Sequence, residues 1–371
     1  MKKKIIFFHP YSVLGGADLS ISKLIDSTSE EYELEFLTIS KQPKINFYSR
    51  RNIKICKIKK KRLLHSVIYL REKFVKDSRS YDKIILISNQ YFANIISILS
   101  TFNLPKIKTI LFERNHLSEL SFSESYLRYI KNKILLLSIK YFYKFADRIV
   151  GNSFQLSKDL SKFTGRKVKT IRNFYDFNKI LINSKKKIIK KIRFKKNIVI
   201  NVGRMEHQKN QILILKTFQI LKKKNNNINL ILIGDGSKKK GLEHYIKKHK
   251  LNKNVQIISG ITNALPYLKK ANLYICTSHY EGFSNVLVEA ITVNLPIIST
   301  YFKSGLSELL LNGKGGTIIK NSSPESIAKK IKSFFDNKKL FKKKAEEAKR
   351  KITELNYFQG QLKFKKLINS L

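Results

Sequence analysis

Cysteine, proline and tryptophan are scarce in this 371-residue chain, which has two, six and none of them. Two cysteines, Cys56 and Cys276, are too few for the disulfide framework of a small secreted domain. A reducing, cytoplasmic location is therefore expected. No cluster of histidine, cysteine and carboxylate residues has the spacing of a metal site, so no bound metal is predicted.

The sequence also lacks a long uninterrupted hydrophobic run. Residues 84–104 carry no charge and are long enough to cross a bilayer, but a Ser-Asn-Gln segment and Asn94 interrupt them. A strand, a polar loop and a helix are expected here instead of a membrane span. Near the start, the apolar residues 5–8 are followed by Pro10 and are too few for a secretory signal, so they are predicted to form a first strand.

Acidic residues are few, since 26 aspartates and glutamates stand against 75 lysines and arginines, and the net charge is +49. So basic a chain suits a nucleic acid or an anionic membrane as partner. No zinc-finger spacing and no aromatic-glycine RNA-binding signature accompanies the charge, and the basic stretches are spread over the whole chain. The richness in lysine, isoleucine and asparagine also fits an AT-rich coding sequence. Nucleic acid is therefore not the expected partner.

Length and apolar content favour two domains, because 371 residues with 42% hydrophobic content can build two cores. A lysine-rich stretch with few core residues lies at 183–197 and marks the join. The predicted divisions are an N-terminal domain over 1–184, a linker over 185–196, a C-terminal domain over 197–355 and a closing helix over 356–371.

The second half alternates short apolar runs with helical segments at intervals of about thirty residues, and the runs do not alternate apolar with polar residues. This pattern is typical of a parallel sheet that is covered on both faces. Ligands of such sheets bind beyond the carboxyl ends of the strands. The loops at Gly203, Gly260 and Glu281 fall at such ends. The runs lie at 198–202, 230–233, 255–258 and 273–277.

The first of these loops contains Gly203, Arg204 and, five residues further on, Lys209. The glycine lets the backbone approach a ligand, the arginine can bind phosphate oxygens through two nitrogens, and the lysine adds a point charge. The segment is a candidate clamp for a diphosphate. The alternative is that Arg204 and Lys209 are two solvated members of a set of 75 basic residues.

The last loop places two carboxylates, Glu281 and Glu289, eight residues apart around a Gly-Phe-Ser-Asn turn. An apolar run directly after a turn predicts a buried helix, whose first N–H groups and dipole suit a phosphate. Glu281 lies before that helix and Glu289 about one turn inside it, so the two can hold different parts of a polyhydroxylated phosphate ester. By itself this spacing also arises by chance.

Four motifs follow one another in the chain: Gly203-Arg204 with Lys209, Gly234-Asp235-Gly236, Glu281-Gly282-Phe283 with Glu289-Ala290, and Leu295-Pro296-Ile297-Ile298. Their combination resembles the retaining glycosyltransferases of family 4, also called group 1 glycosyl transferases, and the resemblance is strong over residues 197 to about 330. It implies the GT-B fold, an α/β architecture of two Rossmann-like, doubly wound domains whose parallel sheets face an interdomain cleft. It also implies that the closing helix packs back on the N-terminal, acceptor-side domain.

The resemblance implies roles for the matching residues of the C-terminal, nucleotide-sugar-binding domain. Arg204 and Lys209 would hold the donor diphosphate. Glu281 would bind hydroxyls of the donor sugar, and Glu289 those of the ribose. Backbone N–H groups of the turn would cradle the distal phosphate and the sugar, although Ser284 stands where many members of the family have proline.

Two segments of the N-terminal half fit the same family. Gly15 and Gly16 precede a predicted helix as in the family's Gly-Gly-Ala-Glu loop, with Asp18 in place of the glutamate; without the family, a plain turn fits as well. His116 follows the strand predicted at 109–112, where family members place a histidine near the donor sugar. Without the family, a loop histidine satisfied by its neighbours is the simpler interpretation.

The candidate site therefore contains two sets of residues. The expected catalytic residues are His116, Glu281, Arg204 and Lys209. The expected donor-binding residues are Gly15, Gly16, Gly203, Gly260, Gly282, Phe283, Ser284, Asn285 and Glu289.

By this resemblance, the chain is expected to be a retaining, metal-independent glycosyltransferase of the hexosyltransferase type. It would move a sugar from a nucleotide-diphosphate sugar, with UDP-sugars the family's commonest donors, to a hydroxyl of a growing lipid-linked or cell-surface glycan such as a lipopolysaccharide or capsule. No cofactor or enzymatic nucleophile is expected, and no Asp-x-Asp motif occurs. The alternatives are a GT-B sugar-nucleotide epimerase and a basic nucleic-acid-binding protein without transferase activity.

Residues 126–144 thread basic residues among leucine, isoleucine, tyrosine and phenylalanine. This composition suits a helix that lies on an anionic lipid surface, and a peripheral position at the inner face of the cell membrane would suit a lipid-linked acceptor. The alternative is an ordinary domain helix with one wet face. The basic residues expected near headgroups are Arg128, Lys131, Lys133, Lys140 and Lys144.

Overall fold

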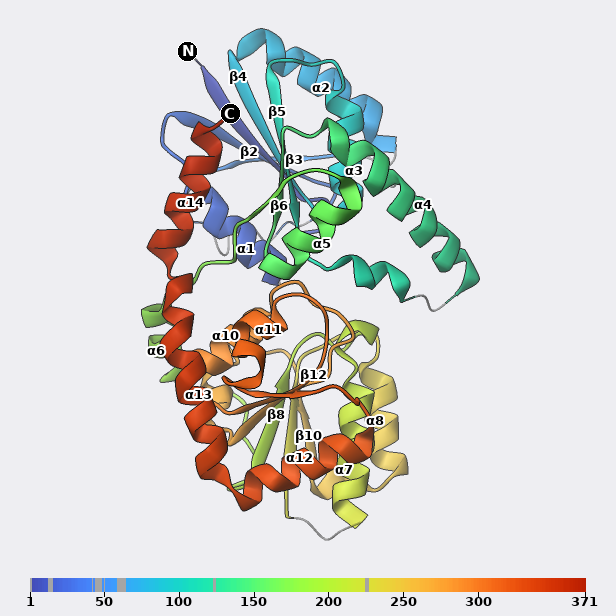
Figure 1. The fold of residues 1–371 in the computed structure, drawn as a ribbon, viewed down its shortest axis with the longest axis vertical. Coiled ribbons are helices and arrows are strands. Elements are labelled where there is room, and N and C mark those ends of the chain that lie inside the picture. The colour runs from blue at the N-terminus through green and yellow to red at the C-terminus, as the bar shows by residue number, and fades with distance from the viewer. Residues whose placement is uncertain are drawn as a thin grey trace. The chain divides into compact units, whose positions relative to one another are not determined.

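The computed structural model describes residues 2–12, 16–41, 43, 49, 51–58, 65–122, 125–223 and 227–371. Its contacts divide the chain into two compact units (Figure 1). The first unit contains Met1–Phe174 and Tyr357–Leu371, and the second contains Tyr175–Asn356.

A seven-stranded parallel sheet forms the centre of the first unit within the described residues. The strand order is β3-β2-β1-β4-β5-β6-β7, so the chain winds outward from β1 in both directions, as in a doubly wound fold. The strands are β1 (Lys3–Phe8), β2 (Tyr32–Thr38), β3 (Lys54–Lys57), β4 (Lys83–Asn89), β5 (Ile107–Glu113), β6 (Arg148–Gly151) and β7 (Val168–Thr170).

Helices cover both faces of this sheet, which explains the apolar runs of the central strands β1 and β4. Alternate residues of β1 enter different cores: Ile5 packs with residues of α1 and α14, and Ile6 packs with residues of α2 and α3. The helices are α1 (Gly16–Ile25), α2 (Ser66–Ser80), α3 (Tyr91–Thr101), α4 (Tyr126–Phe142), α5 (Phe154–Thr164) and α14 (Tyr357–Asn369), with 3-10 turns η3 (Leu117–Ser121) and η4 (Tyr143–Phe145).

The second unit has a six-stranded parallel sheet in the order β10-β9-β8-β11-β12-β13, again winding outward from its first strand. Ile198 and Ile200 face one core, and Val199 between them faces the other. The strands are β8 (Ile198–Val202), β9 (Asn229–Ile233), β10 (Val255–Ile258), β11 (Leu273–Cys276), β12 (Ile297–Thr300) and β13 (Thr317–Ile319).

The helices of the second unit also form two layers, so both units are Rossmann-like and the predicted fold class is confirmed. Residues of α9, α10 and α13 pack in one core, and residues of α7, α8 and α12 pack in the other. The helices are α6 (Phe177–Ser184), α7 (Gln211–Lys223), α8 (Lys239–Lys248), α9 (Leu265–Lys270), α10 (Asn285–Thr292), α11 (Leu306–Leu309), α12 (Pro324–Asp336) and α13 (Lys338–Ile352), with 3-10 turns η5 (His207–Lys209), η6 (Leu251–Lys253), η7 (Leu311–Gly313) and η8 (Thr353–Leu355).

The chain leaves the first unit at Phe174, not at residue 184 where the sequence placed the boundary. Helix α6 packs on α9 and α10, and the carbonyl of Asn183 accepts a hydrogen bond from the side chain of Asn263 at 3.0 Å. The lysine-rich stretch expected as a linker also contacts the second unit, because the Lys190 N–H donates to the Tyr267 hydroxyl at 2.8 Å.

The closing helix α14 belongs to the first unit. Phe364 is fully buried with its ring 6.3 Å from that of Phe112, and the rings of Tyr357 and Phe174 meet edge to face at 5.3 Å. Gly360 lies so close to Phe174 that a Cβ at this position would overlap the phenylalanine side chain. The glycine therefore lets the helix approach the loop that leads out of the unit.

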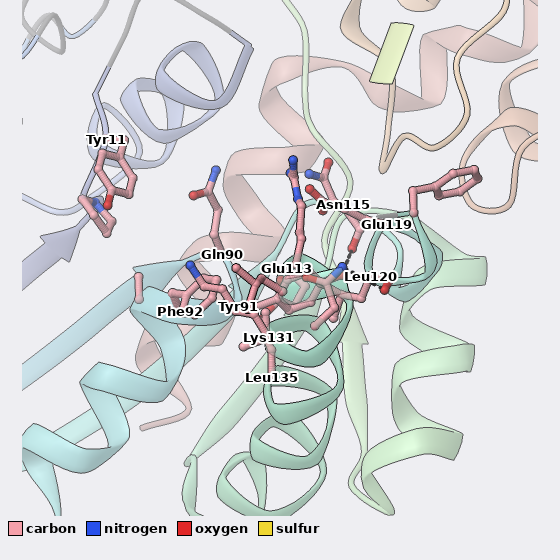
Figure 2. Close-up of a pocket in the computed structure, with 16 residues that line it drawn as sticks. Tyr11, Gln90, Tyr91, Phe92, Glu113, Asn115, Glu119, Leu120, Lys131 and Leu135 are labelled. Carbon is pink, nitrogen blue, oxygen red and sulfur yellow. Dashed lines mark hydrogen bonds between the residues drawn. The ribbon is translucent and has the colours of Figure 1, made fainter. Parts of the chain in front are cut away.

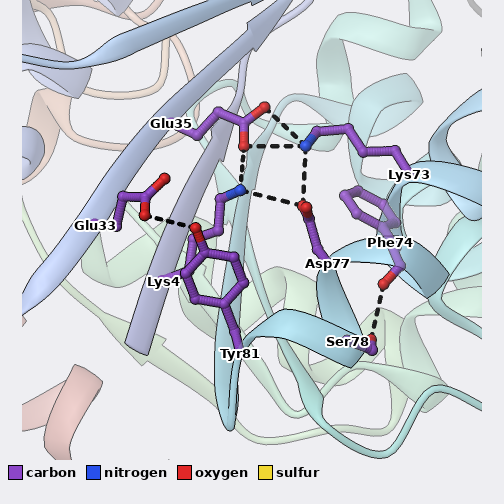
Figure 3. A network of polar contacts seen from close by, with 8 residues as sticks. All are labelled: Lys4, Glu33, Glu35, Lys73, Phe74, Asp77, Ser78 and Tyr81. Atoms are coloured by element: carbon purple, nitrogen blue, oxygen red, sulfur yellow. Dashed lines mark hydrogen bonds and ion pairs between the residues drawn. The ribbon is translucent and has the colours of Figure 1, made fainter. Parts of the chain in front are cut away.

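A buried cluster of charges joins the first two strands to α2 (Figure 3). Lys4 Nζ lies 2.6 Å from Glu35 Oε2 and 3.3 Å from Asp77 Oδ2, and Lys73 Nζ lies 2.9 Å from Asp77 Oδ2. Burial opposes the charge on Lys4, but the hydrogen bonds and charges of Glu35 and Asp77 together outweigh it, and the pKa of Lys4 is raised. The alternation of charges thus lets ionised groups lie between these strands and α2.

Residues 84–104 form strand β4 and helix α3, as the polar interruption at their middle predicted. Across the part of the chain that the structure describes, no helix combines the length and the apolar composition that crossing a bilayer requires.

Candidate functional site

Two loops at the carboxyl edge of the second sheet touch backbone to backbone. A Cβ at Gly234 would overlap the carbonyl oxygen of Gly203, and a Cβ at Gly236 would overlap that of Met205. The Met205 N–H donates to the carbonyl of Asp235 at 2.8 Å. The glycines after β9 therefore allow the loop after β8, which contains the predicted phosphate clamp, to take this course.

Lys209 and Glu281 form an ion pair at this edge, with Lys209 Nζ donating to Glu281 Oε1. The two side chains are 18% and 9% exposed. The Ser278 hydroxyl donates to the same carboxylate oxygen at 2.8 Å. The loops are also joined through backbone, because the His279 N–H donates to the carbonyl of Gln208 at 2.9 Å. The sequence placed both charged residues in the site, and the structure brings them together.

Arg204 is exposed at the end of β8, and its carbonyl accepts a hydrogen bond from the Gln211 side chain at 3.1 Å. Glu206 nearby is held by the Ser237 hydroxyl and N–H at 2.6 and 2.8 Å. Burial raises the pKa of Glu206, but the hydrogen bonds from Ser237 and the charge of Arg204 outweigh it, so that the pKa is lowered. The Arg204 guanidinium therefore acts on a Glu206 carboxylate that is ionised and already hydrogen-bonded to Ser237.

The Glu281 turn is fixed by the loop after β12. The carbonyl of Gly282 accepts hydrogen bonds from the Gly305 N–H at 2.9 Å and the Ser304 hydroxyl at 2.7 Å. Ser304 adopts a φ of +104°, and a Cβ at Gly305 would lie 2.7 Å from the ring of Phe283. A strained serine and a glycine without room for a side chain thus hold the turn in place.

Helix α10 begins directly after this turn, with Ser284 as its N-cap. Within the described residues the Ser284 side chain makes no capping hydrogen bond, so it does not cover the first-turn N–H groups. The Asn285 side chain accepts a hydrogen bond from the Tyr175 hydroxyl at 2.6 Å. This geometry suits an anion at the helix N-terminus.

Glu289 is half-buried in α10, one turn after Asn285. Burial raises the pKa of the Tyr274 hydroxyl well above its ordinary value, and the charges of Glu281 and Glu289 add to this effect. Both predicted carboxylates thus lie within electrostatic reach of one buried side chain of β11.

Gly260 follows β10 with a φ of +65°, and its N–H donates to Asp235 Oδ2 at 2.9 Å. This bond joins the loops after β9 and β10, and it is the main reason that the pKa of Asp235 is lowered. At one edge of its sheet, the second unit therefore gathers the predicted residues of three loops and of helix α10. They are Gly203, Arg204, Lys209, Gly260, Glu281, Gly282, Phe283 and Ser284 in the loops, and Asn285 and Glu289 in α10.

The remaining predicted residues belong to the first unit. Gly15 lies outside the described residues, and Gly16 is the exposed first residue of α1. Asp18, which stands in place of the glutamate of the Gly-Gly-Ala-Glu motif, is buried and accepts a hydrogen bond from the Ser12 hydroxyl at 2.7 Å. His9 lies 3.8 Å from Asp18; burial first, and then the charge of Arg114, lower its pKa to about 3.

His116 uses both ring nitrogens inside the first unit. Nδ1 accepts a hydrogen bond from the Ser118 N–H at 3.0 Å, which leaves the Nε2 proton to be donated to Asp159 Oδ2 at 2.8 Å. The ring is 4% exposed and caps the 3-10 turn η3. This arrangement fixes the loop after β5.

A cavity of about 520 Å³ lies at the carboxyl ends of β4 and β5 and against α4 (Figure 2). Gln90 lines the cavity and has φ +78° and ψ 149°, a backbone conformation that residues other than glycine rarely adopt. Glu113 at the end of β5 is fully buried, and burial raises the pKa of its carboxyl to about 8. Asn94 and Tyr143 donate hydrogen bonds to this carboxyl group. A strained backbone and a neutral acid therefore line one concave site.

Sequence reasoning missed Ser278, Ser304, Gln90 and Glu113. The first two are small hydroxyl residues in loops, which give no signal until the turns are folded. Gln90 appeared only as a polar interruption, and Glu113 was not among the residues singled out. The position of Glu113 directly after an apolar strand was the one available signal.

Three comparisons place the chain among known proteins. Residues 184–351 match the sequence profile of the family described as glycosyl transferases group 1. An uncharacterised glycosyltransferase of Methanocaldococcus jannaschii is 34% identical over 251 residues, which are 64% of this chain and 60% of the relative. The chain therefore spans less than two thirds of that relative's length. A Campylobacter jejuni α-1,4-N-acetyl-D-galactosaminyltransferase, named for a glycan on PP-undecaprenol, is 24% identical over 95% of both chains.

Among solved structures, Anabaena HepE in complex with UDP-glucose superimposes with a TM-score of 0.79 at 18% identity, covering 99% of this chain and 100% of HepE. That likeness concerns the fold, and the sequence match concerns mainly the second unit. Residues 184–351 thus match the group 1 glycosyl transferases in sequence, and the two units have the GT-B fold.

Proposed function

We propose that the chain is a retaining glycosyltransferase that moves a sugar from a nucleotide-diphosphate sugar to a hydroxyl of a growing glycan. The observation that supports this most is the Lys209–Glu281 pair at a sheet edge, beside the N-terminus of α10. The Lys209 ammonium suits a phosphate, and the Glu281 carboxylate suits sugar hydroxyls. The match of residues 184–351 to a glycosyl transferase family and a relative named for galactosaminyl transfer support the same activity.

In this proposal the second unit binds the donor. Arg204, Lys209 and the first N–H groups of α10 neutralise the diphosphate, and they act most strongly as negative charge develops on the leaving group. Glu281 binds hydroxyls of the sugar, and Glu289 binds those of the ribose. Because two cations and a helix N-terminus supply the positive charge, the proposed reaction needs no metal.

The chemical step breaks the bond between the sugar's anomeric carbon and the diphosphate oxygen, and forms a bond from that carbon to the acceptor oxygen on the same face. The acceptor proton goes to an oxygen of the departing phosphate, so configuration is retained without an enzymatic nucleophile. His116, predicted as catalytic, has both ring nitrogens engaged in the first unit. We therefore assign it the task of positioning the loop after β5.

The acceptor is proposed to be a lipid-linked glycan, bound in the first-unit cavity between Gln90 and α4. The Campylobacter relative is named for an acceptor on PP-undecaprenol, and HepE was solved with UDP-glucose. A UDP-sugar is accordingly the proposed donor.

A panel of UDP-, GDP-, ADP- and dTDP-sugars, titrated calorimetrically into the wild type and Glu289→Ala, tests the donor site. We expect one nucleotide to bind and the variant to lose at least about tenfold in affinity, the loss of one good polar contact. Product formed with the chelator EDTA present and with unchanged anomeric configuration by NMR would support the retaining, metal-independent mechanism. If no donor binds at millimolar concentration, the proposal is wrong.

A further inference from the structure

Helix α4 turns an apolar face to solvent. Of its 17 residues, only Leu135 and Ile139 are buried. Tyr126 and Leu127 are 76% and 79% exposed, and Ile134 is 59% exposed. Single exposed apolar residues are common on protein surfaces, but a whole helix face of them marks an interaction site.

The exposed residues form one stripe along the helix axis. Tyr126, Ile130, Ile134, Leu137 and Tyr141 follow one another at spacings of four and three residues, which places them on the same face. Their face lies opposite the two buried residues that anchor the helix to the first unit. An ordinary surface helix has the reverse pattern, with apolar residues inward and polar residues outward.

Basic residues flank the stripe, and residues 126–144 contain no aspartate or glutamate. Lys133 Nζ lies 5.3 Å from the centre of the Tyr129 ring, and Lys144 Nζ lies 5.6 Å from that of Tyr141. Their long side chains thus lie along the aromatic rings while the ammonium groups stay at the surface. An apolar ridge with cationic flanks is complementary to a layer of hydrocarbon beneath anionic headgroups.

The apolar surface continues past the end of the helix. Phe145 is 60% exposed, and its ring meets that of Phe102, which is 51% exposed, edge to face at 5.8 Å. Phe102 follows α3 and Phe145 ends η4, so two separate segments extend the patch in the first unit.

We propose that α4 and the adjoining Phe102 and Phe145 dock the first unit on an anionic phospholipid bilayer, with the helix lying in the plane of the interface. A second copy of this chain fits less well, because each copy would bring the same row of cations to the contact. An anionic lipid surface neutralises that row and covers the apolar stripe at the same time.

The opposite flank of α4 lines the first-unit cavity through Leu127, Arg128, Lys131, Asn132 and Leu135 (Figure 2). Leu127 belongs both to the exposed face and to the cavity wall. A lipid-linked acceptor could therefore pass from the bilayer into the cavity along one helix. This last step rests on the proposed function, whereas docking on the bilayer does not.

Flotation with vesicles of phosphatidylcholine alone, and of phosphatidylcholine mixed with phosphatidylglycerol, tests the docking. The wild type is expected to float with the anionic vesicles and weakly with the neutral ones. The double variant Ile134→Glu/Leu137→Glu should lose about tenfold or more in partitioning. It puts two negative charges on the helix, which the anionic headgroups repel, and it removes two apolar contacts with the lipid. Neither residue lines the cavity.

The matched control is Ile182→Glu/Ile189→Glu, which adds the same charge at isoleucines of the second unit that are 64% and 73% exposed. This control should float as the wild type does. Equal flotation of the α4 variant and the control would overturn the proposal, as would a wild type that ignores anionic vesicles. A wild-type dimer that the α4 variant dissociates would also overturn it, in favour of a contact between copies.

Donor binding by calorimetry separates the two proposals. The α4 variant, if folded by circular dichroism, should bind the nucleotide sugar as the wild type does while its flotation is lost. Failure of donor binding in the wild type would contradict the transferase and leave the docking result standing.

Discussion

Lys209 donates a hydrogen bond to Glu281, and Ser278 donates a second one to the same carboxylate oxygen. The lysine comes from the loop after β8 and the glutamate from the loop after β11, which are neighbouring strands of the sheet. The pair therefore orients the residue proposed for phosphate and the residue proposed for sugar with one contact. It also gives the largely buried lysine a counter-charge.

Glu281→Ala is expected to abolish transfer while the fold remains. A contact that strengthens as the transition state forms accounts for about 10²- to 10³-fold in rate. The substitution also leaves Lys209 and Ser278 without their acceptor, so the free energy of unfolding should fall by about 1–3 kcal/mol. Transfer rates and urea unfolding measure the two effects. Glu325→Ala, an exposed glutamate of α12, is the control and should change neither; full turnover in Glu281→Ala would remove it from the site.

Arg204→Ala is expected to weaken donor binding without destabilising the protein, because the side chain is exposed. Loss of a bidentate contact with phosphate should reduce affinity by at least about tenfold. Arg204→Lys should recover only part of this, since an ammonium cannot reproduce the two parallel hydrogen bonds. Calorimetry with the donor measures the effect. Lys330→Ala removes an exposed charge from α12, and a loss of similar size there would show that net charge, not Arg204, determines binding.

Gly234→Ala and Gly241→Ala are expected to have opposite effects on stability. A Cβ at Gly234 would overlap the Gly203 carbonyl oxygen, so the first change must displace the loop that holds the proposed clamp. A Cβ at Gly241, within α8, meets no described atom within 4 Å. The second change should therefore stabilise the protein by about 0.5–1 kcal/mol. Thermal unfolding compares the two, and a neutral Gly234→Ala would show that the two loops are not closely packed.

The parallel sheets could be predicted because their strands are apolar on both faces, as Ile198, Val199 and Ile200 illustrate. The motif spacing likewise located Gly203, Lys209 and Glu281 at strand ends. What the sequence could not give was contact between distant segments. The lysine-rich stretch looked like a linker, yet Lys190 binds Tyr267. A lysine run has the same composition whether or not its backbone finds a partner.

The first-unit cavity was missed for a related reason. In the sequence Gln90 is a plain polar residue, and nothing there indicates the positive φ that it adopts between β4 and α3. Glu113 reads as an ordinary loop glutamate, and only tertiary packing removes it from water. Its burial nevertheless gives a clear expectation for the effect of pH.

Glu113 should make the protein less stable as pH rises. Burial raises its pKa from 4.5 to about 8, so the folded state holds the proton more tightly than the unfolded chain. The stability from this proton is fully present below the unfolded pKa of 4.5 and is lost as pH rises through the folded pKa. Glu113→Gln keeps the shape and the hydrogen bonds but cannot ionise, so its free energy of unfolding should exceed that of the wild type increasingly toward high pH.

Urea unfolding from about pH 5 to about pH 9 measures this difference, which should reach the order of a few kcal/mol. Glu325→Gln makes the same exchange at an exposed glutamate of α12 and provides the control; a difference of the same size there would show that the effect is not specific to Glu113. Parallel profiles for the wild type and Glu113→Gln would mean that the carboxyl group is ionised in the folded protein. The cavity would then present an anion beside Gln90, and a polar acceptor hydroxyl would meet a charged base in place of a neutral acid.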